Sequence, residues 1–197
     1  MDTIQDIVNR IELSGQKHKT KLIAVDGLGG SGKSTFVKMV VAINPKIKVL
    51  ELDHFPCLPE ENPYHSAGAQ TRVNLDRFKK EAIIPLTLGN QAIYENTFWW
   101  PTKEKPKKYE IAPGGVVIVE GCYSYHSELR EFYDLSIWIS CHKEKALKRA
   151  IARDGKQGIE IWQKAHAPNE RNYALLQKPM DYVDLIVDNN DGDFRLV

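Results

Sequence analysis

The amino-acid sequence predicts a three-layer α/β fold organised around a mainly five-stranded parallel sheet. Short apolar runs that favour β-strands alternate along the chain with segments of helical periodicity, which is typical of a doubly wound sheet. The runs are residues 22–25, 49–53, 116–120, 135–139 and 184–188. A glycine-rich turn joins the first run to a long helix, and the runs 49–53 and 116–120 end on carboxylates. Because ligands bind at the carboxyl ends of strands in such sheets, we expect the functional site at that edge.

A helix is expected before the first strand. Ile4, Ile7, Val8 and Ile11 recur at helical spacing with polar residues between them. This spacing predicts an amphipathic helix over residues 3–14 that packs beside the first strand.

The glycine-rich turn has the sequence Gly27-Leu28-Gly29-Gly30-Ser31-Gly32-Lys33-Ser34, which matches G-x-x-x-x-G-K-[ST] at every specified position. It lies between an apolar run and a segment, 35–42, that can continue as a helix, as a P-loop requires. Glycines let successive backbone N–H groups point at a polyphosphate, and the helix N-terminus adds its positive dipole end. Lys33 is expected to reach the β- and γ-phosphates, and the Ser34 hydroxyl to ligate Mg²⁺. The predicted nucleotide-binding residues are Gly27, Gly29, Gly30, Ser31, Gly32, Lys33, Ser34 and Thr35.

Asp53 and Glu120 each end a predicted parallel strand, so both should lie at the same edge of the sheet as the P-loop. Phosphoryl transfer to an alcohol needs one carboxylate to accept or orient the hydroxyl proton, and commonly another to fix Mg²⁺. We expect Asp53 to take the first role and Glu120, near Ser34, the second. The alternative is that either acid caps a following helix.

The middle of the chain is expected to form a substrate-side insertion over about 56–110. Residues 56–71 carry three prolines and predict a long loop, and 73–88 predict a helix that Pro85 kinks or divides. Residues 92–100 predict one arm of a small hairpin. Its Lys-rich turn at 102–108 favours a solvated tip over a nucleic-acid patch, and Trp99 and Trp100 favour core packing over stacking on an acceptor.

The segment of about 143–165 is expected to be a lid. Arg149 and Arg153 lie four residues apart on one face of a helix, and their guanidinium groups suit the clamping of phosphate oxygens. The alternative is a solvated face paired with nearby acids. Two further helical segments, 159–165 and 170–177, should be separated by a break at Pro168. His54 is the histidine that we expect nearest the site, but a loop histidine whose hydrogen bonds are met elsewhere is an equally good interpretation.

The composition predicts one globular domain over residues 1–197. The apolar fraction is 42%, the charged fraction 27% and the formal charge +1, so charge gives no reason to expect nucleic acid or an anionic membrane as partner. No run approaches the roughly 20 apolar residues of a membrane span, and no signal-peptide pattern is present, so a cytoplasmic protein is expected. Three widely spaced cysteines predict reduced thiols. The oligomeric state stays open, a homo-oligomer included.

Several stretches in the same order resemble one branch of the P-loop kinases. They are residues 24–27 leading into 29–35, Asp53-His54-Phe55, Val119-Glu120-Gly121, Tyr133-Asp134-Leu135, residues 149–154 and residues 184–189. The set resembles the uridine kinase and phosphoribulokinase branch, which includes bacterial pantothenate kinase. The resemblance implies a P-loop NTPase fold, in which Asp53 activates the acceptor hydroxyl, Glu120 lies near Mg²⁺, and Arg149 and Arg153 close over ATP.

The function expected from this resemblance is ATP- and Mg²⁺-dependent phosphorylation of a small metabolite, with a nucleoside as first choice. The segment that holds the nucleoside in uridine kinases is not recognisable in residues 94–100, so pantothenate, glycerate or a sugar stays open as acceptor. A nucleotide-binding switch is a further alternative. A GTPase should carry N-K-x-D after a late strand, whereas residues 188–191 have Asn in place of Lys. The expected partners are therefore ATP and a small-molecule acceptor.

Overall fold

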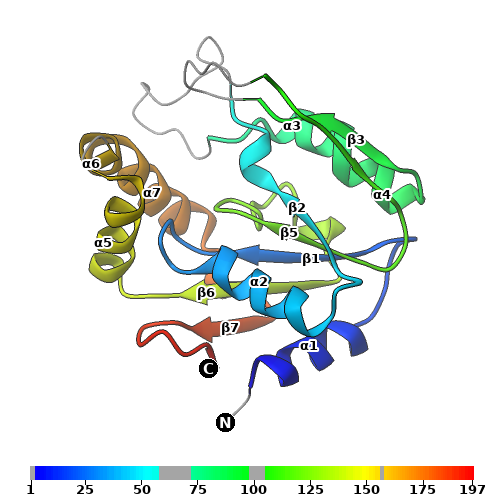
Figure 1. Ribbon diagram of the computed structural model, residues 1–197, viewed down its shortest axis with the longest axis horizontal. Helices are drawn as coiled ribbons and strands as arrows, with labels where there is room; N and C mark the ends of the chain where they lie inside the picture. The colour runs from blue at the N-terminus through cyan, green and yellow to red at the C-terminus, as the bar shows by residue number, and fades with distance from the viewer. Residues whose placement is uncertain (1–2, 58–71, 98–104, 156–157) are drawn as a thin grey trace.

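A six-stranded sheet forms the centre of the computed structural model, which describes residues 3–57, 72–97, 105–155 and 158–197 (Figure 1). The strand order is β2-β5-β1-β6-β7-β8. The first five strands in this order run parallel and β8 adds a short antiparallel edge, so the predicted α/β fold with a mainly parallel sheet is confirmed. The strands are β1 Lys21–Asp26, β2 Lys48–Glu51, β5 Val116–Glu120, β6 Leu135–Ser140, β7 Leu185–Asp188 and β8 Arg195–Leu196.

Helices α1 (Ile4–Leu13) and α2 (Lys33–Ile43) cover one face of this sheet. The first helix begins at a capping box, in which Thr3 and Asp6 each accept a hydrogen bond from the other's backbone N–H. Alternate strand residues point toward the two helices, as the period of two in a strand requires. The core on this face contains Ile7, Val8, Ile11, Ile23, Val25, Phe36, Val37, Val40, Ile118, Ile137 and Ile139.

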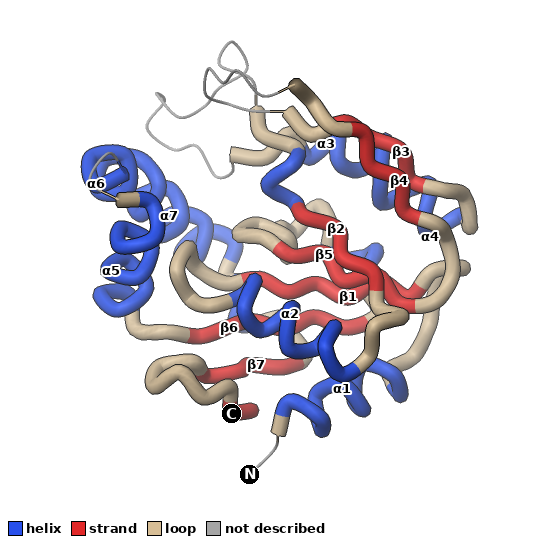
Figure 2. Tube along the Cα trace, in the orientation of Figure 1, coloured by secondary structure: helices blue, strands red, loops and turns tan. Residues whose placement is uncertain are grey.

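The predicted insertion covers part of the opposite face. Its helix consists of α3 (Leu75–Phe78), a π-helical turn over Lys79–Ile83 and α4 (Ile84–Leu88). Pro85 has no N–H to donate, and the chain accommodates it by the wider turn that precedes α4. The hairpin pairs β3 (Ala92–Glu95) with β4 (Lys108–Ile111), and both strands lie beside this helix in Figure 2. The division of the helix near Pro85 and the small hairpin are therefore as predicted.

Three helices lie together beyond the carboxyl ends of the strands, on the left of Figure 1. They are α5 (Lys143–Asp154), α6 (Gly158–Ile161) and α7 (Ala167–Gln177). The break predicted at Pro168 is wrong, because a π-helical turn over Trp162–His166 carries α6 into α7. In that turn Ala167 N–H bonds to the carbonyl of Trp162, five residues back, and Pro168 follows in the first turn of α7, where a missing N–H is tolerated. None of the described helices combines the length and apolar character needed to cross a membrane.

The strand predicted over 49–53 is shorter than expected. It ends at Glu51, and Asp53 lies in a 3₁₀ turn over Leu52–His54. The chain turns there because Leu52 and Phe55 are fully buried below the turn while Asp53 is exposed. Most of the loop predicted over 56–71, and Trp99 and Trp100, lie outside the described residues.

Candidate active site

One cleft of about 800 Å³ opens at the carboxyl ends of β1, β2 and β5. It is lined by P-loop residues, by strand-end acids and by residues of α5 to α7. The predicted site residues that it brings together are Gly29, Gly30, Gly32, Lys33, Ser34, Thr35, Asp53, Glu120, Arg149 and Arg153. Segments more than 100 residues apart in the sequence thus meet in one hollow.

The P-loop wraps around the side chain of Lys33. The ammonium group of Lys33 donates to the carbonyl oxygens of Gly27 at 2.8 Å and Leu28 at 3.1 Å, and α2 begins at Lys33. Gly32 has φ +103°, which a side chain would strain, so the loop needs glycine there. Ser31 is buried and does not line the cleft, and its carbonyl accepts a hydrogen bond from the Asn189 side chain at 2.7 Å. The P-loop conformation is therefore stabilised by the Lys33 ammonium group inside the loop and by Asn189, which follows β7.

Ser34 and Glu120 lie side by side where the P-loop meets the end of β5. The Ser34 hydroxyl donates to Oε1 of Glu120 at 3.1 Å. Burial raises the pKa of the Glu120 carboxyl, and the nearby Lys33 ammonium partly offsets that rise. In the described part of the chain no three His, Cys, Asp or Glu side chains cluster as a metal site. The Ser34 hydroxyl and the Glu120 carboxylate are oxygen donors of the kind that Mg²⁺ binds, so a divalent cation would fit here with water and phosphate oxygens as its other ligands.

Asp53 faces the same cleft from the turn after β2. Its negative charge is among the causes that raise the pKa of Glu120, so the two carboxylates are close enough to interact. His54 is directed elsewhere. Its ring lies 4.4 Å from that of Tyr109 in the hairpin, so it packs against the insertion and does not line the cleft.

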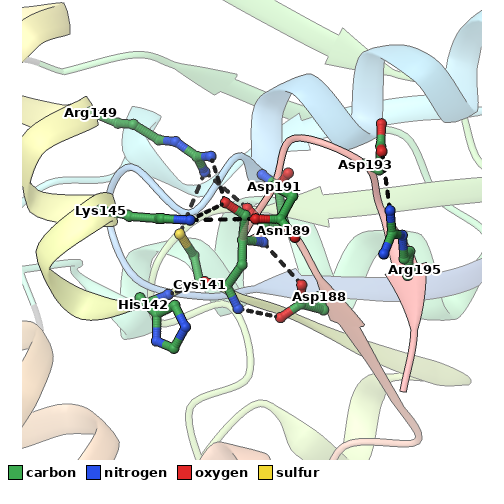
Figure 3. A network of polar contacts seen from close by, with 10 residues as sticks. Cys141, His142, Lys145, Arg149, Asp188, Asn189, Asp191, Asp193 and Arg195 are labelled. Carbon is green, nitrogen blue, oxygen red and sulfur yellow. Dashed lines mark hydrogen bonds and ion pairs between the residues drawn. The ribbon is translucent and has the colours of Figure 1, made fainter.

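Arg149 and Arg153 both line the cleft but differ in their contacts. Arg149 donates to the carbonyl oxygen of Asn189 at 3.1 Å, and Figure 3 shows it extending from α5 toward the loop after β7. Arg153 pairs with its neighbour Asp154, with Nε 2.6 Å from Oδ1. Their predicted contact with ATP stays a prediction. The described contacts connect Arg149 to the loop after β7. They connect Arg153 to its own helix and to the ring of Trp162, whose centroid lies 5.9 Å from the Arg153 guanidinium carbon.

A helical wall, defined here as Trp162, His166, Glu170 and Tyr173, packs directly on the P-loop. Oε2 of Glu170 accepts a hydrogen bond from the Gly29 N–H at 2.8 Å. A Cβ added at Gly29 would lie 2.2 Å from Cη2 of Trp162, so the wall leaves no room for a side chain there. Burial raises the pKa of Glu170, against the opposing effect of Arg72, Lys33 and the Gly29 N–H.

A second contact joins this wall to the start of the P-loop. Asp26 is fully buried at the end of β1, and it accepts hydrogen bonds from the Tyr173 hydroxyl at 2.5 Å and from the N–H groups of Gly27, Tyr123 and Tyr125. Burial raises the pKa of Asp26. Since Glu170 and Tyr173 lie three residues apart, one face of α7 holds both Asp26 and Gly29.

Arg72 also lines the cleft, in contact with the helical wall. Its Nη1 lies 2.9 Å from Nδ1 of His166, and its Nη2 lies 3.9 Å from Oε1 of Glu170. Burial and the charge of Arg72 lower the pKa of His166 to about 3, so this imidazole is neutral. Four of these residues, Arg72, Trp162, His166 and Glu170, were not predicted from the sequence. Arg72 follows the predicted substrate-side loop, which was a usable signal, whereas the other three fit no recognised motif.

No family model matches this chain. Its sequence is 26% identical over 184 residues to a uridine kinase of Borrelia turicatae and 27% identical over 186 residues to one of Borrelia hermsii. In both comparisons 85% of this chain and 85% of the relative are covered.

Three solved structures share the fold. A protein described as a possible uridine kinase from Bacillus stearothermophilus superposes with a TM-score of 0.70 at 14% identity, covering 93% of this chain and 96% of its own. A proposed fructose transport system kinase from Silicibacter sp. TM1040 superposes with a TM-score of 0.71 at 19% sequence identity, covering 89% of this chain and 95% of its own. D-glycerate 3-kinase from Cryptococcus neoformans superposes with a TM-score of 0.64 at 12% sequence identity, covering 98% of this chain and 96% of its own. This chain is therefore a distant homologue of uridine kinases and has the fold of P-loop kinases.

Proposed function

We propose that the protein is an ATP- and Mg²⁺-dependent kinase that phosphorylates a hydroxyl group of a small metabolite, with a nucleoside as the first candidate acceptor. The observation that carries this proposal is that Lys33 and Ser34 of the P-loop line the same cleft as two carboxylates, Asp53 and Glu120. The distant homology to uridine kinases supports it.

In this proposal Asp53 is the acceptor-activating group. The acceptor oxygen attacks the γ-phosphorus, the bond between that phosphorus and the β–γ bridging oxygen breaks, and ADP leaves. Asp53 takes the hydroxyl proton, since its carboxylate is exposed to the cleft and follows the strand next to β5. Lys33 stabilises the charge that develops on the phosphoryl oxygens, together with Arg149 and Arg153 of a lid over about 143–165.

Ser34 and Glu120 are the residues that would hold Mg²⁺, the serine through its hydroxyl and the acid through coordinated water. When bound, Mg²⁺ neutralises and orients the phosphate oxygens. The 3.1 Å contact between the two side chains supports the assignment. Burial raises the pKa of Glu120, so a cation bound beside it would stabilise the ionised carboxylate.

A kinase for a non-nucleoside acceptor, such as pantothenate, glycerate or a sugar, is the second candidate. Arg72 favours an acid among these, because its guanidinium lines the cleft and nucleosides carry no negative charge. The third reading, a nucleotide switch, is weaker. Asn189, within the segment that would need N-K-x-D, donates to the Ser31 carbonyl and so supports the P-loop from beneath.

The proposal is tested by ATP consumption with a panel of nucleosides, pantothenate, glycerate and sugars. We expect Mg²⁺-dependent ADP formation with at least one of them, and a phosphorylated acceptor in equal amount by mass spectrometry. ATP binding without turnover across the whole panel would favour the switch reading.

Replacing Asp53 tests the assignment of the base. Asp53→Asn keeps the size of the side chain but removes its basicity, so turnover should fall by roughly 10²- to 10⁴-fold while ATP binding survives. Asp193→Asn is the matched control, since Asp193 is 76% exposed and pairs with Arg195 at the far edge of the sheet. Near-normal turnover of Asp53→Asn with the best acceptor would remove Asp53 from this role.

A further inference from the structure

Arg72 is a cation that lines the cleft, and its backbone is hydrogen-bonded to the segment that follows Asp53. The Cys57 N–H donates to the carbonyl of Arg72 at 2.8 Å, and Pro56 and Val73 form an antiparallel bridge. Cys57 is four residues from Asp53, so a short paired segment sets the distance between the guanidinium and the proposed base. The Arg72 side chain is 17% exposed, so part of it can be reached from the cleft that it lines.

The guanidinium is oriented by two buried side chains of the helical wall. His166 contacts it at 2.9 Å, and this imidazole is neutral, so it orients the cation without cancelling its charge. Glu170 lies between Arg72 and the P-loop, with Oε2 on the Gly29 N–H at 2.8 Å and Oε1 3.9 Å from Nη2 of Arg72. One carboxyl group therefore places the cation relative to the loop that holds phosphate.

The electrostatic influence of Arg72 extends across the cleft. Burial lowers the pKa of His166, and the positive charge of Arg72 lowers it further. The same charge opposes the rise in pKa that burial causes in Glu170 and in Cys122 after β5, and the rise that the hydrogen bond to Asp154 causes in Arg153 on α5. These groups come from three sides of the same hollow. An anion that enters the hollow beyond Lys33 would meet this charge in a partly desolvated place, where a guanidinium binds two oxygens at once.

We propose that Arg72 binds an oxyanion at the transfer centre, a phosphoryl or carboxylate group, with Glu170 and His166 as its positioning residues. The proposal rests on the proposed function for the identity of the two substrates. The same chemistry has two sources: the γ-phosphoryl group of ATP, or a negative group on the acceptor.

The test measures equilibrium binding by calorimetry, so it does not depend on turnover. Arg72→Gln removes the charge, and Arg72→Lys keeps the charge but loses the planar fork of donors. Arg195→Gln is the matched control, since Arg195 lies on the edge strand β8 and pairs with Asp193. Thermal melting identifies any variant that does not fold. If Arg72→Gln does not fold, Arg72→Lys is used for the test instead, because its positive charge still balances the negative charge of Glu170.

The probes separate the two sources. If the oxyanion is the γ-phosphoryl group, Arg72→Gln weakens a non-hydrolysable ATP analogue by roughly tenfold or more but ADP by much less, as expected for one charge-assisted contact. If the oxyanion belongs to the acceptor, Arg72→Gln binds both nucleotides normally. In the presence of the ATP analogue, its affinity for D-glycerate or pantothenate then falls, while its affinity for uridine and ribose does not. Arg72→Lys should fall between wild type and Arg72→Gln.

An unchanged ratio of ATP-analogue to ADP affinity, together with no anionic acceptor that binds wild type better than Arg72→Gln, would overturn the proposal. Failure of the proposed function looks different. In that case Arg72-dependent binding of the oxyanion persists, but no acceptor in the panel is phosphorylated.

Discussion

The P-loop wall of the cleft, formed by residues 27–35 with Asp53 and Glu120, contrasts with the helical wall that packs on it. In the P-loop wall, residues 27–35, the turn after β2 and the end of β5 supply the groups, and neighbouring parallel strands bring them together. In the helical wall, Trp162 and Glu170 reach Gly29 from more than 130 positions along the chain. The residues predicted to bind phosphate are thus mostly consecutive in the sequence, whereas the residues that pack on the P-loop come from distant positions.

The largest expected effect comes from breaking the P-loop wall at its cation. Lys33→Ala should lower turnover by on the order of 100-fold or more, because the ammonium group that would stabilise the transferred phosphoryl is lost. Nucleotide titration and turnover with the best acceptor measure this, with Lys46→Ala, an exposed lysine beyond α2, as the control. Equal nucleotide affinity and turnover in Lys33→Ala and wild type would refute the phosphate role of the loop.

The next effect comes from forcing the two walls apart. In Gly29→Ala the new methyl group would meet Trp162, which is 3% exposed and cannot move aside easily. Overpacking of this kind should lower the free energy of unfolding by about 1–3 kcal/mol and raise the KM for ATP. Urea denaturation measures the first quantity and steady-state kinetics the second.

Gly15→Ala is the matched control for Gly29→Ala. Neither glycine has a positive φ, but a Cβ at Gly15 meets nothing within 4 Å. Gly15→Ala should therefore be neutral or slightly stabilising. If Gly29→Ala were equally harmless, the close packing of Trp162 on the loop would not matter for stability.

The sequence predicted the P-loop wall well and the helical wall poorly. Strand periodicity and the P-loop motif predicted the parallel sheet and the meeting of Lys33, Ser34, Asp53 and Glu120, because parallel strand ends must share an edge. Helix continuity at Pro168 was predicted wrongly, since a π-helical turn is set by tertiary packing and leaves no composition signal. Glu170 could not be identified either, because an acid in a polar helix is usually solvated and only the fold places it on Gly29.

A smaller effect, on the Mg²⁺ dependence of the rate, distinguishes the proposed role of Glu120 from that of Asp53. Glu120→Gln removes the carboxylate charge beside Ser34, so we expect the Mg²⁺ concentration for half-maximal rate to rise by roughly tenfold. Glu51→Gln is the control, because Glu51 is the register partner of Glu120 on β2 but is exposed. A Mg²⁺ titration of the rate that gives the same midpoint in wild type and Glu120→Gln would contradict the metal assignment.

The smallest effect tests the contact between α7 and the start of the P-loop. Tyr173→Phe removes the hydroxyl that donates to Asp26, and it should lower the free energy of unfolding by about 1 kcal/mol. Tyr182→Phe, at a tyrosine that is 60% exposed, is the control. The pH dependence gives the sharper readout. Burial raises the folded-state pKa of Asp26, and the Tyr173 hydroxyl opposes that rise by stabilising the carboxylate.

Without the hydroxyl, the folded-state pKa of Asp26 should rise further from its unfolded value. A raised carboxyl pKa means that the folded state still binds a proton at pH values where the unfolded state has lost it. The free energy of unfolding therefore decreases as the pH rises through the folded-state pKa. The cost of Tyr173→Phe should therefore be smallest at acid pH, where Asp26 is protonated in both proteins, and should increase as the pH rises. Urea denaturation of both proteins from pH 4 to pH 8 checks this. A cost that stays constant or falls with pH would mean that the Tyr173 hydroxyl does not stabilise an ionised Asp26, and that α7 is held to the P-loop by packing and by Glu170 alone.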